Sequence, residues 1–219
     1  MNTDEIVFTD DVFKSRLAQA NDKESIAQLA FEIIEDSLAN RQKSKTLHSR
    51  FEKLLDKGLD INIPHKEYDG GSCIWGIQYG YTDYHLKTAR LIFDRCGLPS
   101  VIDDGGETFF QWIEGKVMYN YFDSYFLVRL FLLCLSYMDS YDLIKFETNV
   151  YQKMLDGLYI SSFDLRDGDG PLKLDLSFLR DYKNIDFCIE MEEQKQGYYG
   201  CWKMHIYHKK SRIKIATLG

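Results

Sequence analysis

The chain has 219 residues, of which 45% are hydrophobic, and a formal net charge of −7. Such a chain can bury the core of one large or two small domains, which excludes wholesale disorder and any need for metal or disulfide support. Residues 198–219 carry +5, which leaves −12 on residues 1–197, and an acidic body of this kind disfavours general binding to nucleic acid.

The first third of the chain shows helical spacing. A short amphipathic helix is predicted over residues 10–20, and Asn21-Asp22 offers a cap for a second helix. The second helix has apolar residues three and four positions apart: Ile26, Leu29, Ala30, Ile33, Ile34 and Leu38. Ser44 is predicted to cap a third helix, which Gly58 ends. Further helices are predicted over residues 73–77, 84–96, 108–113, 123–138 and 140–156.

After about Gly157 the spacing changes to the two-residue period of strands. Strands are predicted over 185–192, 199–207 and 213–215, with a turn at 194–197. One or two short strands are predicted over 159–177, with a turn at 167–170. Helices followed by strands indicate an α+β fold class. We expect a helical-hairpin stack over residues 1–157 and a small antiparallel β-meander over residues 158–219 packed on it.

The end of the third predicted helix carries a further pattern. Residues 54–62 read Leu-Leu-Asp-Lys-Gly-Leu-Asp-Ile-Asn, and Asp-Gly-Gly triplets begin at Asp69 and Asp104, 35 residues apart. Over about residues 45–115 this resembles an ankyrin repeat, whose outer helix closes in this way before a hairpin tip. The Thr-Pro-Leu-His signature of that family is absent, with Ser-Cys-Ile-Trp at 72–75 and Thr-Phe-Phe-Gln at 108–111 in its place. A plain helical-hairpin array without ankyrin kinship is the alternative. The resemblance implies protein recognition through a concave face and hairpin tips.

Cysteine and histidine give no pattern typical of a cofactor or metal site, so none is expected. The five cysteines have irregular spacing without a Cys-x-x-Cys pair and are interpreted as small core residues in a reducing compartment. Cys201 and His205 lie about 13 Å apart on a predicted strand, too far to form a catalytic pair. All five histidines are expected at a surface or an interface.

The start of the chain and its most apolar segment indicate where in the cell the protein is found. Residues 1–5 are acidic and lack the basic region of a signal peptide. Residues 125–138 are too short to span a bilayer and contain Arg129. The sequence therefore predicts a cytoplasmic protein that does not enter a membrane.

Tyrosines and acidic residues gather near the predicted helix junctions, and tyrosine is enriched at protein interfaces. The candidate partner-binding residues are Asp69, Tyr79, Tyr81, Asp83, Tyr84, Asp103, Asp104, Glu107 and Trp112. The expected partner is another protein with a basic surface, since an acidic body speeds encounter with such a surface.

The sequence thus favours a non-catalytic cytosolic protein-binding module, and one concrete version is an immunity protein that neutralises a bacterial toxin through an acidic surface. Two alternatives stay open. One is an enzyme with a site between the helical and β regions that uses Cys201 or His205 with a carboxylate. The other is a regulatory subunit whose edge at residues 211–217 adds to a partner's sheet by β-augmentation.

Overall fold

The computed structural model describes residues 8–39, 43–119, 124–138, 166–167, 170–171, 176–179, 185–196 and 199–218. The chain divides into two compact units, residues 1–113 and 114–219. The expected domain boundary at residue 157 lies outside the described residues, and the packing of the β region on the helices stays a prediction.

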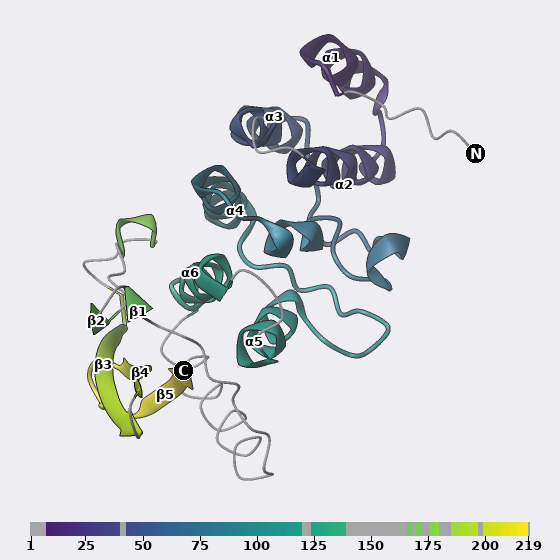
Figure 1. The fold of residues 1–219 in the computed structure, drawn as a ribbon. Coiled ribbons are helices and arrows are strands. Elements are labelled where there is room, and N and C mark those ends of the chain that lie inside the picture. The colour runs from purple at the N-terminus through teal and green to yellow at the C-terminus, as the bar shows by residue number, and fades with distance from the viewer. Residues whose placement is uncertain are drawn as a thin grey trace. The chain divides into compact units, whose positions relative to one another are not determined.

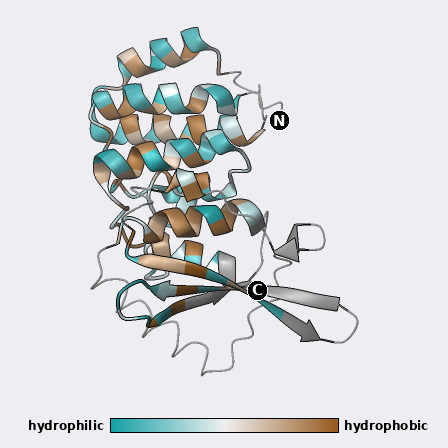
Figure 2. Cartoon of the chain, turned by 90° about the vertical axis from the view of Figure 1, so that its left-hand side faces the viewer, coloured by the Kyte–Doolittle hydropathy of each residue, from teal (hydrophilic) through white to brown (hydrophobic). Residues whose placement is uncertain are grey.

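Helices of the first unit follow the sequence periodicity closely (Figure 1). They are α1 (Asp10–Gln19), α2 (Lys23–Ala39), α3 (Ser44–Asp56), α4 (Asp83–Cys96) and the first residues of α5 (Phe109–Tyr119). Figure 2 shows α1 to α4 lying side by side in layers, with hydrophobic and hydrophilic residues recurring along each helix. The stack therefore has the layered arrangement that the amphipathic spacing predicts.

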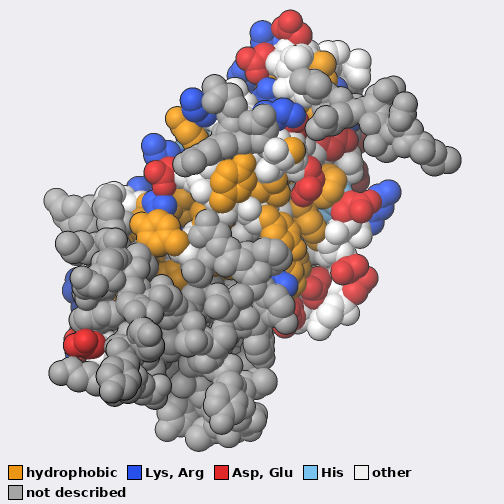
Figure 3. Space-filling view, viewed as in Figure 1, with side chains coloured by type: hydrophobic (Ala, Val, Ile, Leu, Met, Phe, Trp, Pro, Cys, Tyr) orange, Lys and Arg blue, Asp and Glu red, His pale blue; other side chains and the backbone are white. Residues whose placement is uncertain are grey.

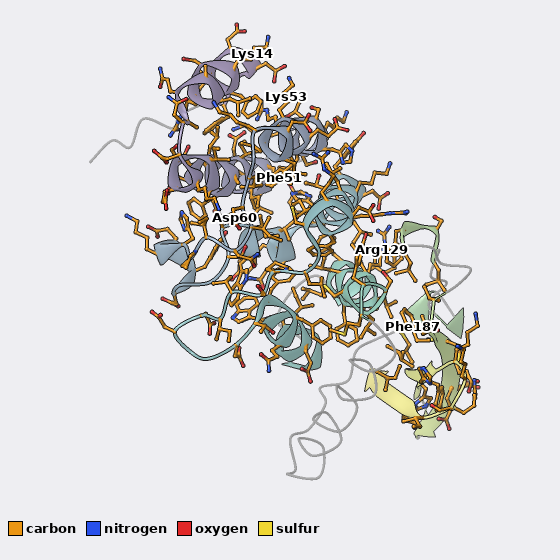
Figure 4. The ribbon with its side chains drawn as sticks, turned by 180° about the vertical axis from the view of Figure 1, so that it is seen from behind. Lys14, Phe51, Lys53, Asp60, Arg129 and Phe187 are labelled. Atoms are coloured by element: carbon orange, nitrogen blue, oxygen red, sulfur yellow. The ribbon has the colours of Figure 1, made fainter. Side chains whose placement is uncertain are left out.

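The core of this unit forms where α2 and α3 face each other and where α4 covers α3. Ile33 on α2 and Leu47 and Phe51 on α3 are almost fully inaccessible to solvent. Phe51 is labelled in Figure 4. Burial of one such side chain stabilises a fold by about 1.5–3 kcal/mol.

Polar caps fix where these helices start. The Asp22 carboxylate accepts a hydrogen bond from the backbone N–H of Ser25 at 2.6 Å, as predicted for the start of α2. Thr82 caps α4 by accepting from the backbone N–H of His85. The expected cap at Ser44 is wrong: Ser44 is the first residue of α3, is buried, and its hydroxyl lies 3.3 Å from that of Thr82.

Two hairpin loops project from the helices, one between α3 and η2 (Trp75–Tyr79) and one between α4 and α5. The first loop is closed by an antiparallel bridge between Pro64 and Ser72, and the second by one between Ile102 and Thr108. The backbone N–H of Asp104 donates to the carbonyl oxygen of Asp69 at 2.7 Å, so the tips of the two loops are hydrogen-bonded to each other. The Asp-Gly-Gly triplets thus form the turns that their residue types predict.

The short helices beside the first loop are of the 3-10 type: η1 (Lys66–Tyr68) and η2 (Trp75–Tyr79). The inner helix predicted over residues 73–77 is therefore present in a tighter and shifted form. Buried Trp75 and Ile77 anchor η2 to the core, and Gly80 ends it.

In its described residues, the second unit contains the rest of α5, α6 (Ser124–Leu135), η3 (Leu176–Phe178) and five strands. The short strands β1 (Arg166–Asp167) and β2 (Gly170–Pro171) pair antiparallel, as predicted for 159–177. Strands β3 (Phe187–Gln196), β4 (Tyr199–His208) and β5 (Lys214–Leu218) form an antiparallel sheet in that order. The helix predicted over 140–156 lies outside the described residues. The α+β fold class is confirmed, with helices first and a small sheet last.

Strand boundaries differ from the sequence pattern at two places. β3 continues through residues 194–196, which were predicted to turn, and its Gln196 pairs with Tyr199. A register shift between Ile206 and Tyr207 interrupts the pairing of β4 with β5. Met204, His205 and Ile206 are all buried, although His205 faces the opposite side of the sheet from its two neighbours in this regularly paired stretch.

Candidate functional site

The tips of the two hairpin loops carry a group of carboxylates. Asp69 lies on the first tip, and Asp103, Asp104 and Glu107 lie on the second. The Asp103 carboxylate accepts a hydrogen bond from the backbone N–H of Glu107 at 2.8 Å, which stiffens the second tip. Among the residues that the structure describes, none of these four carboxylates forms an ion pair with a lysine or arginine. Their negative charge is therefore presented to solvent.

Glycines allow the tips to lie this close together. Gly70 and Gly106 adopt φ of +80° and +83°, a conformation that side chains with a Cβ rarely adopt. A Cβ on Gly70 would also lie 3.0 Å from Oδ1 of Asp104. The close approach of the two acidic tips thus depends on the Asp-Gly-Gly sequence of the first loop.

Aromatic side chains lie next to these loops, around η2 and the start of α5. The Tyr79 and Trp112 rings meet edge to face, with centroids 6.2 Å apart. Trp112 in turn packs against the buried ring of Trp75 at 5.8 Å. Tyr79 keeps 39% of its surface exposed. Figure 3 shows hydrophobic side chains across the middle of this view and carboxylates along its right-hand edge.

Three further residues belong to this surface, although the sequence does not single them out: Phe31, Glu35 and Tyr68. The Tyr68 hydroxyl donates a hydrogen bond to Oε1 of Glu35 at 2.9 Å, and the Tyr68 ring packs edge-on against Phe31. Burial, followed by the negative charge of Glu35, raises the pKa of Tyr68 well above its ordinary value, so its hydroxyl remains a neutral donor. Glu35 and Phe31 sit on α2 outside its apolar stripe, where the helical pattern predicts ordinary solvated positions.

The predicted residues Tyr81, Asp83 and Tyr84 form a separate group at the start of α4. They follow the C-terminal end of η2, whereas the hairpin tip precedes its N-terminal end, and η2 spans about 10 Å at 2 Å per residue. Tyr81 and Tyr84 are exposed, as predicted, and the Tyr81 hydroxyl donates to the carbonyl oxygen of Leu38 at 3.4 Å. The predicted set is thus divided between the two ends of η2, and Tyr79, its last residue, contacts Trp112 of α5.

The prediction that all five histidines lie at a surface or an interface is wrong for four of them. His65, His85, His205 and His208 are buried, not at the surface, and His85 is wholly inaccessible. The rings are buried because hydroxyl, amide and carboxylate groups of the chain replace water around them.

His85 is held by two such groups. Its Nδ1 lies 2.6 Å from the hydroxyl of Thr82, and its Nε2 lies 3.1 Å from that of Ser37. Burial lowers the pKa of His85 to about 4, so the ring is neutral at pH 7. These contacts tie α4 to α2 and give His85 a structural role.

Cysteines divide into buried and accessible ones. Cys73 and Cys134 are buried as predicted, and burial raises the pKa of the Cys73 thiol to about 12. A thiol with so high a pKa is a poor nucleophile at neutral pH. Cys96 is exposed and Cys188 half-buried, so the prediction that the cysteines are core residues is wrong for these two. The side chain of Cys201 lies outside the described residues.

His205 meets a carboxylate across the β3–β4 pair. Its Nε2 lies 2.7 Å from Oε2 of Glu192, a contact that orients the imidazole. Within the described ranges no three or more histidine, cysteine, aspartate or glutamate side chains are placed to hold a metal ion. The enzyme alternative, with a site between the two regions, stays a prediction. The β-augmentation alternative also stays one, although β5 is an edge of the three-stranded order.

Comparison with protein-family models, curated proteins and solved structures finds no match for this chain. The ankyrin resemblance therefore stays a prediction, although the structure has paired hairpin loops where the resemblance places them. Among the described residues, no helix combines the length and the apolar character that crossing a bilayer requires.

Proposed function

We propose that the first unit is a protein-binding module that recognises a basic surface of another protein. The contact surface consists of the hairpin tips, with Asp69, Asp103, Asp104 and Glu107, and the adjoining rings of Tyr79 and Trp112. In this reading the protein works by shape and negative potential and makes no covalent bond.

The observation that carries the proposal is the pair of joined tips, whose four carboxylates form no ion pair with a lysine or arginine among the described residues, next to the exposed ring of Tyr79 and the half-buried ring of Trp112. Between Ile102 and Thr108 the chain has three carboxylates and no lysine or arginine. A surface of one charge sign attracts a partner of the opposite sign and speeds the encounter, while desolvated aromatic rings supply most of the binding energy once docked. Both elements lie within one compact unit and do not depend on how the two units are placed.

One biological version of this proposal is an immunity protein that neutralises a basic bacterial toxin in the cytoplasm. What supports it is the same acidic surface, together with the overall charge of −7. It adds to the general proposal only the identity of the partner, and a toxin gene beside the gene for this chain would support that identity.

A capture experiment tests the proposal. The full chain is immobilised as wild type and as the triple variant Asp103→Asn, Asp104→Asn, Glu107→Gln, and both are exposed to a cell extract at low salt. We expect the wild type to retain proteins of high isoelectric point, and the triple variant to retain at least about tenfold less of the same proteins. Retention should fall steeply as salt screens the charges.

The matched control changes three exposed carboxylates elsewhere: Asp11→Asn, Glu24→Gln and Glu52→Gln. This variant has the same net charge as the loop variant, so equal losses in both would show a nonspecific charge effect and contradict a defined surface. Recovery of only acidic or neutral proteins by the wild type would also refute the proposal.

A further inference from the structure

One carboxylate of α2 differs from its neighbours in having no cation. Glu32 pairs with Arg16 at 2.6 Å, and Asp36 pairs with Lys43 at 2.7 Å. Glu35 lies between these two in the sequence and is exposed, yet within the described part of the chain no lysine or arginine lies within ion-pair distance of it. The chain thus neutralises the carboxylates on either side of Glu35 and leaves this one unpaired.

Aromatic rings surround Glu35 in place of a cation. Tyr68 fixes Oε1 of the carboxylate by its hydrogen bond at 2.9 Å, and the Tyr68 ring meets Phe31 with centroids 5.3 Å apart. Gly76 lets η2 approach closely, because a Cβ there would lie 3.1 Å from the same Oε1. Tyr79 lies three residues further along η2, near enough for the charge of Glu35 to act on its phenol.

The electrostatic effect of Glu35 reaches these rings. Burial, together with the negative charge of Glu35, raises the pKa of Tyr79 as it does that of Tyr68. Both phenols therefore remain neutral, and their ring faces keep the negative quadrupole that attracts cations. Tyr79 meets Trp112 at an interplanar angle of 81°, so Trp112 adds a ring face of different orientation beside Tyr79.

We infer that this group, the Glu35 patch (Phe31, Glu35, Tyr68, Tyr79 and Trp112), receives the cation of one lysine or arginine side chain of the protein partner. The inference rests on the proposed function, because it names the contact that the basic partner makes after the acidic tips have attracted it. A carboxylate held beside aromatic faces offers an ammonium or guanidinium group both an ion pair and cation–π contacts. Tyr68 occupies one carboxylate oxygen, which leaves Oε2 for the incoming cation.

The test uses the full chain and two synthetic probes, acetyl-(Gly-Lys)4-amide and acetyl-(Gly-Arg)4-amide, with binding measured by calorimetry and by tryptophan fluorescence. We expect Glu35→Gln to weaken binding of the preferred peptide about fivefold, in line with the loss of an ion pair beside aromatic rings. Tyr79→Leu should weaken it by a similar factor, and Tyr79→Phe should restore it to within about twofold of wild type, because phenylalanine keeps the ring face. The ratio between the two peptides decides whether ammonium or guanidinium is preferred.

Glu24→Gln is the matched control, since it makes the same charge change on the exposed start of α2, about 16 Å away along the helix at 1.5 Å per residue. Equal affinities of Glu35→Gln and Glu24→Gln would overturn the inference, as would a wild-type chain that binds neither peptide. Circular dichroism of each variant serves as the check that it remains folded. The proposed function fails on a different result, namely equal retention of basic proteins by the wild type and the hairpin-tip variant.

Discussion

Because His85 is buried, the free energy of unfolding should depend on pH. Its pKa in the folded chain is lowered to about 4, while an unfolded chain has the ordinary value of about 6.5. Between these values the unfolded state binds more protons than the folded state, so the free energy of unfolding falls as pH falls through this window. The contribution of neutral His85 to the free energy of unfolding is therefore fully present above about pH 6.5 and is lost as the pH falls toward 4.

We therefore expect the free energy of unfolding to fall by about 2 kcal/mol from this residue between pH 7 and pH 5. The measurement is urea denaturation at both pH values for wild type and for His85→Gln, which keeps a polar side chain near Ser37 and Thr82. His65, whose pKa burial also lowers, contributes equally in both chains, so the difference in slope isolates His85. Identical pH dependences in the two chains would contradict the assignment.

For single residues, the sequence predicts the exposure of three tyrosines well and the burial of polar side chains poorly. The exposure of Tyr79, Tyr81 and Tyr84 is predictable, because aromatic residues next to turns often lie at a surface. The burial of His85 depends on hydroxyls of Ser37 and Thr82 that are distant in sequence, and no local pattern reveals such a meeting. Glu35 could not be predicted for the same reason, since Tyr68 reaches it from a loop 33 residues later.

At the scale of elements, Gly76 controls how η2 packs on α2 and the first hairpin loop. A Cβ at this position would overlap the hydroxyl of Tyr68 and lie 2.9 Å from Cγ2 of Ile34. We expect Gly76→Ala to lower the free energy of unfolding by about 1–3 kcal/mol, because the Tyr68 side chain must leave Glu35 to make room.

The control for this substitution is Gly115→Ala in α5, where a Cβ would meet no atom within 4 Å. Because alanine favours a helix, this change should stabilise the chain by about 0.5–1 kcal/mol. Denaturant unfolding of both variants gives the comparison. A neutral or stabilising effect of Gly76→Ala would show that η2 does not approach α2 as described.

Helix and strand types follow from the sequence because periodicity and caps act locally. The apolar spacing of α2 and the glycine after α3 place these elements within a few residues of their predicted bounds. Tertiary packing decides the rest. Ser44 begins α3 inside the core, and His205 is buried beside Glu192 although its strand neighbours Met204 and Ile206 are buried on the opposite side, because contacts with other elements outweigh the local pattern.

At the scale of the whole molecule, charge is divided between the two ends of the chain. Residues 198–219 carry +5 within a protein of net charge −7, while the acidic hairpin tips lie in the first unit. A basic partner is therefore attracted to the first unit and repelled by the last strands. This division explains why one protein can present a defined acidic surface without being uniformly acidic.

Amide NMR of the full, isotopically labelled chain, titrated with acetyl-(Gly-Lys)4-amide or its arginine counterpart, locates the surface that binds a basic peptide. We expect the largest chemical-shift changes at residues 66–72, 75–79 and 103–108 and around Glu35, and we expect them to fade with added salt. Largest shifts in β3–β5, or on the solvent faces of α3 and α4, would contradict the proposed binding surface.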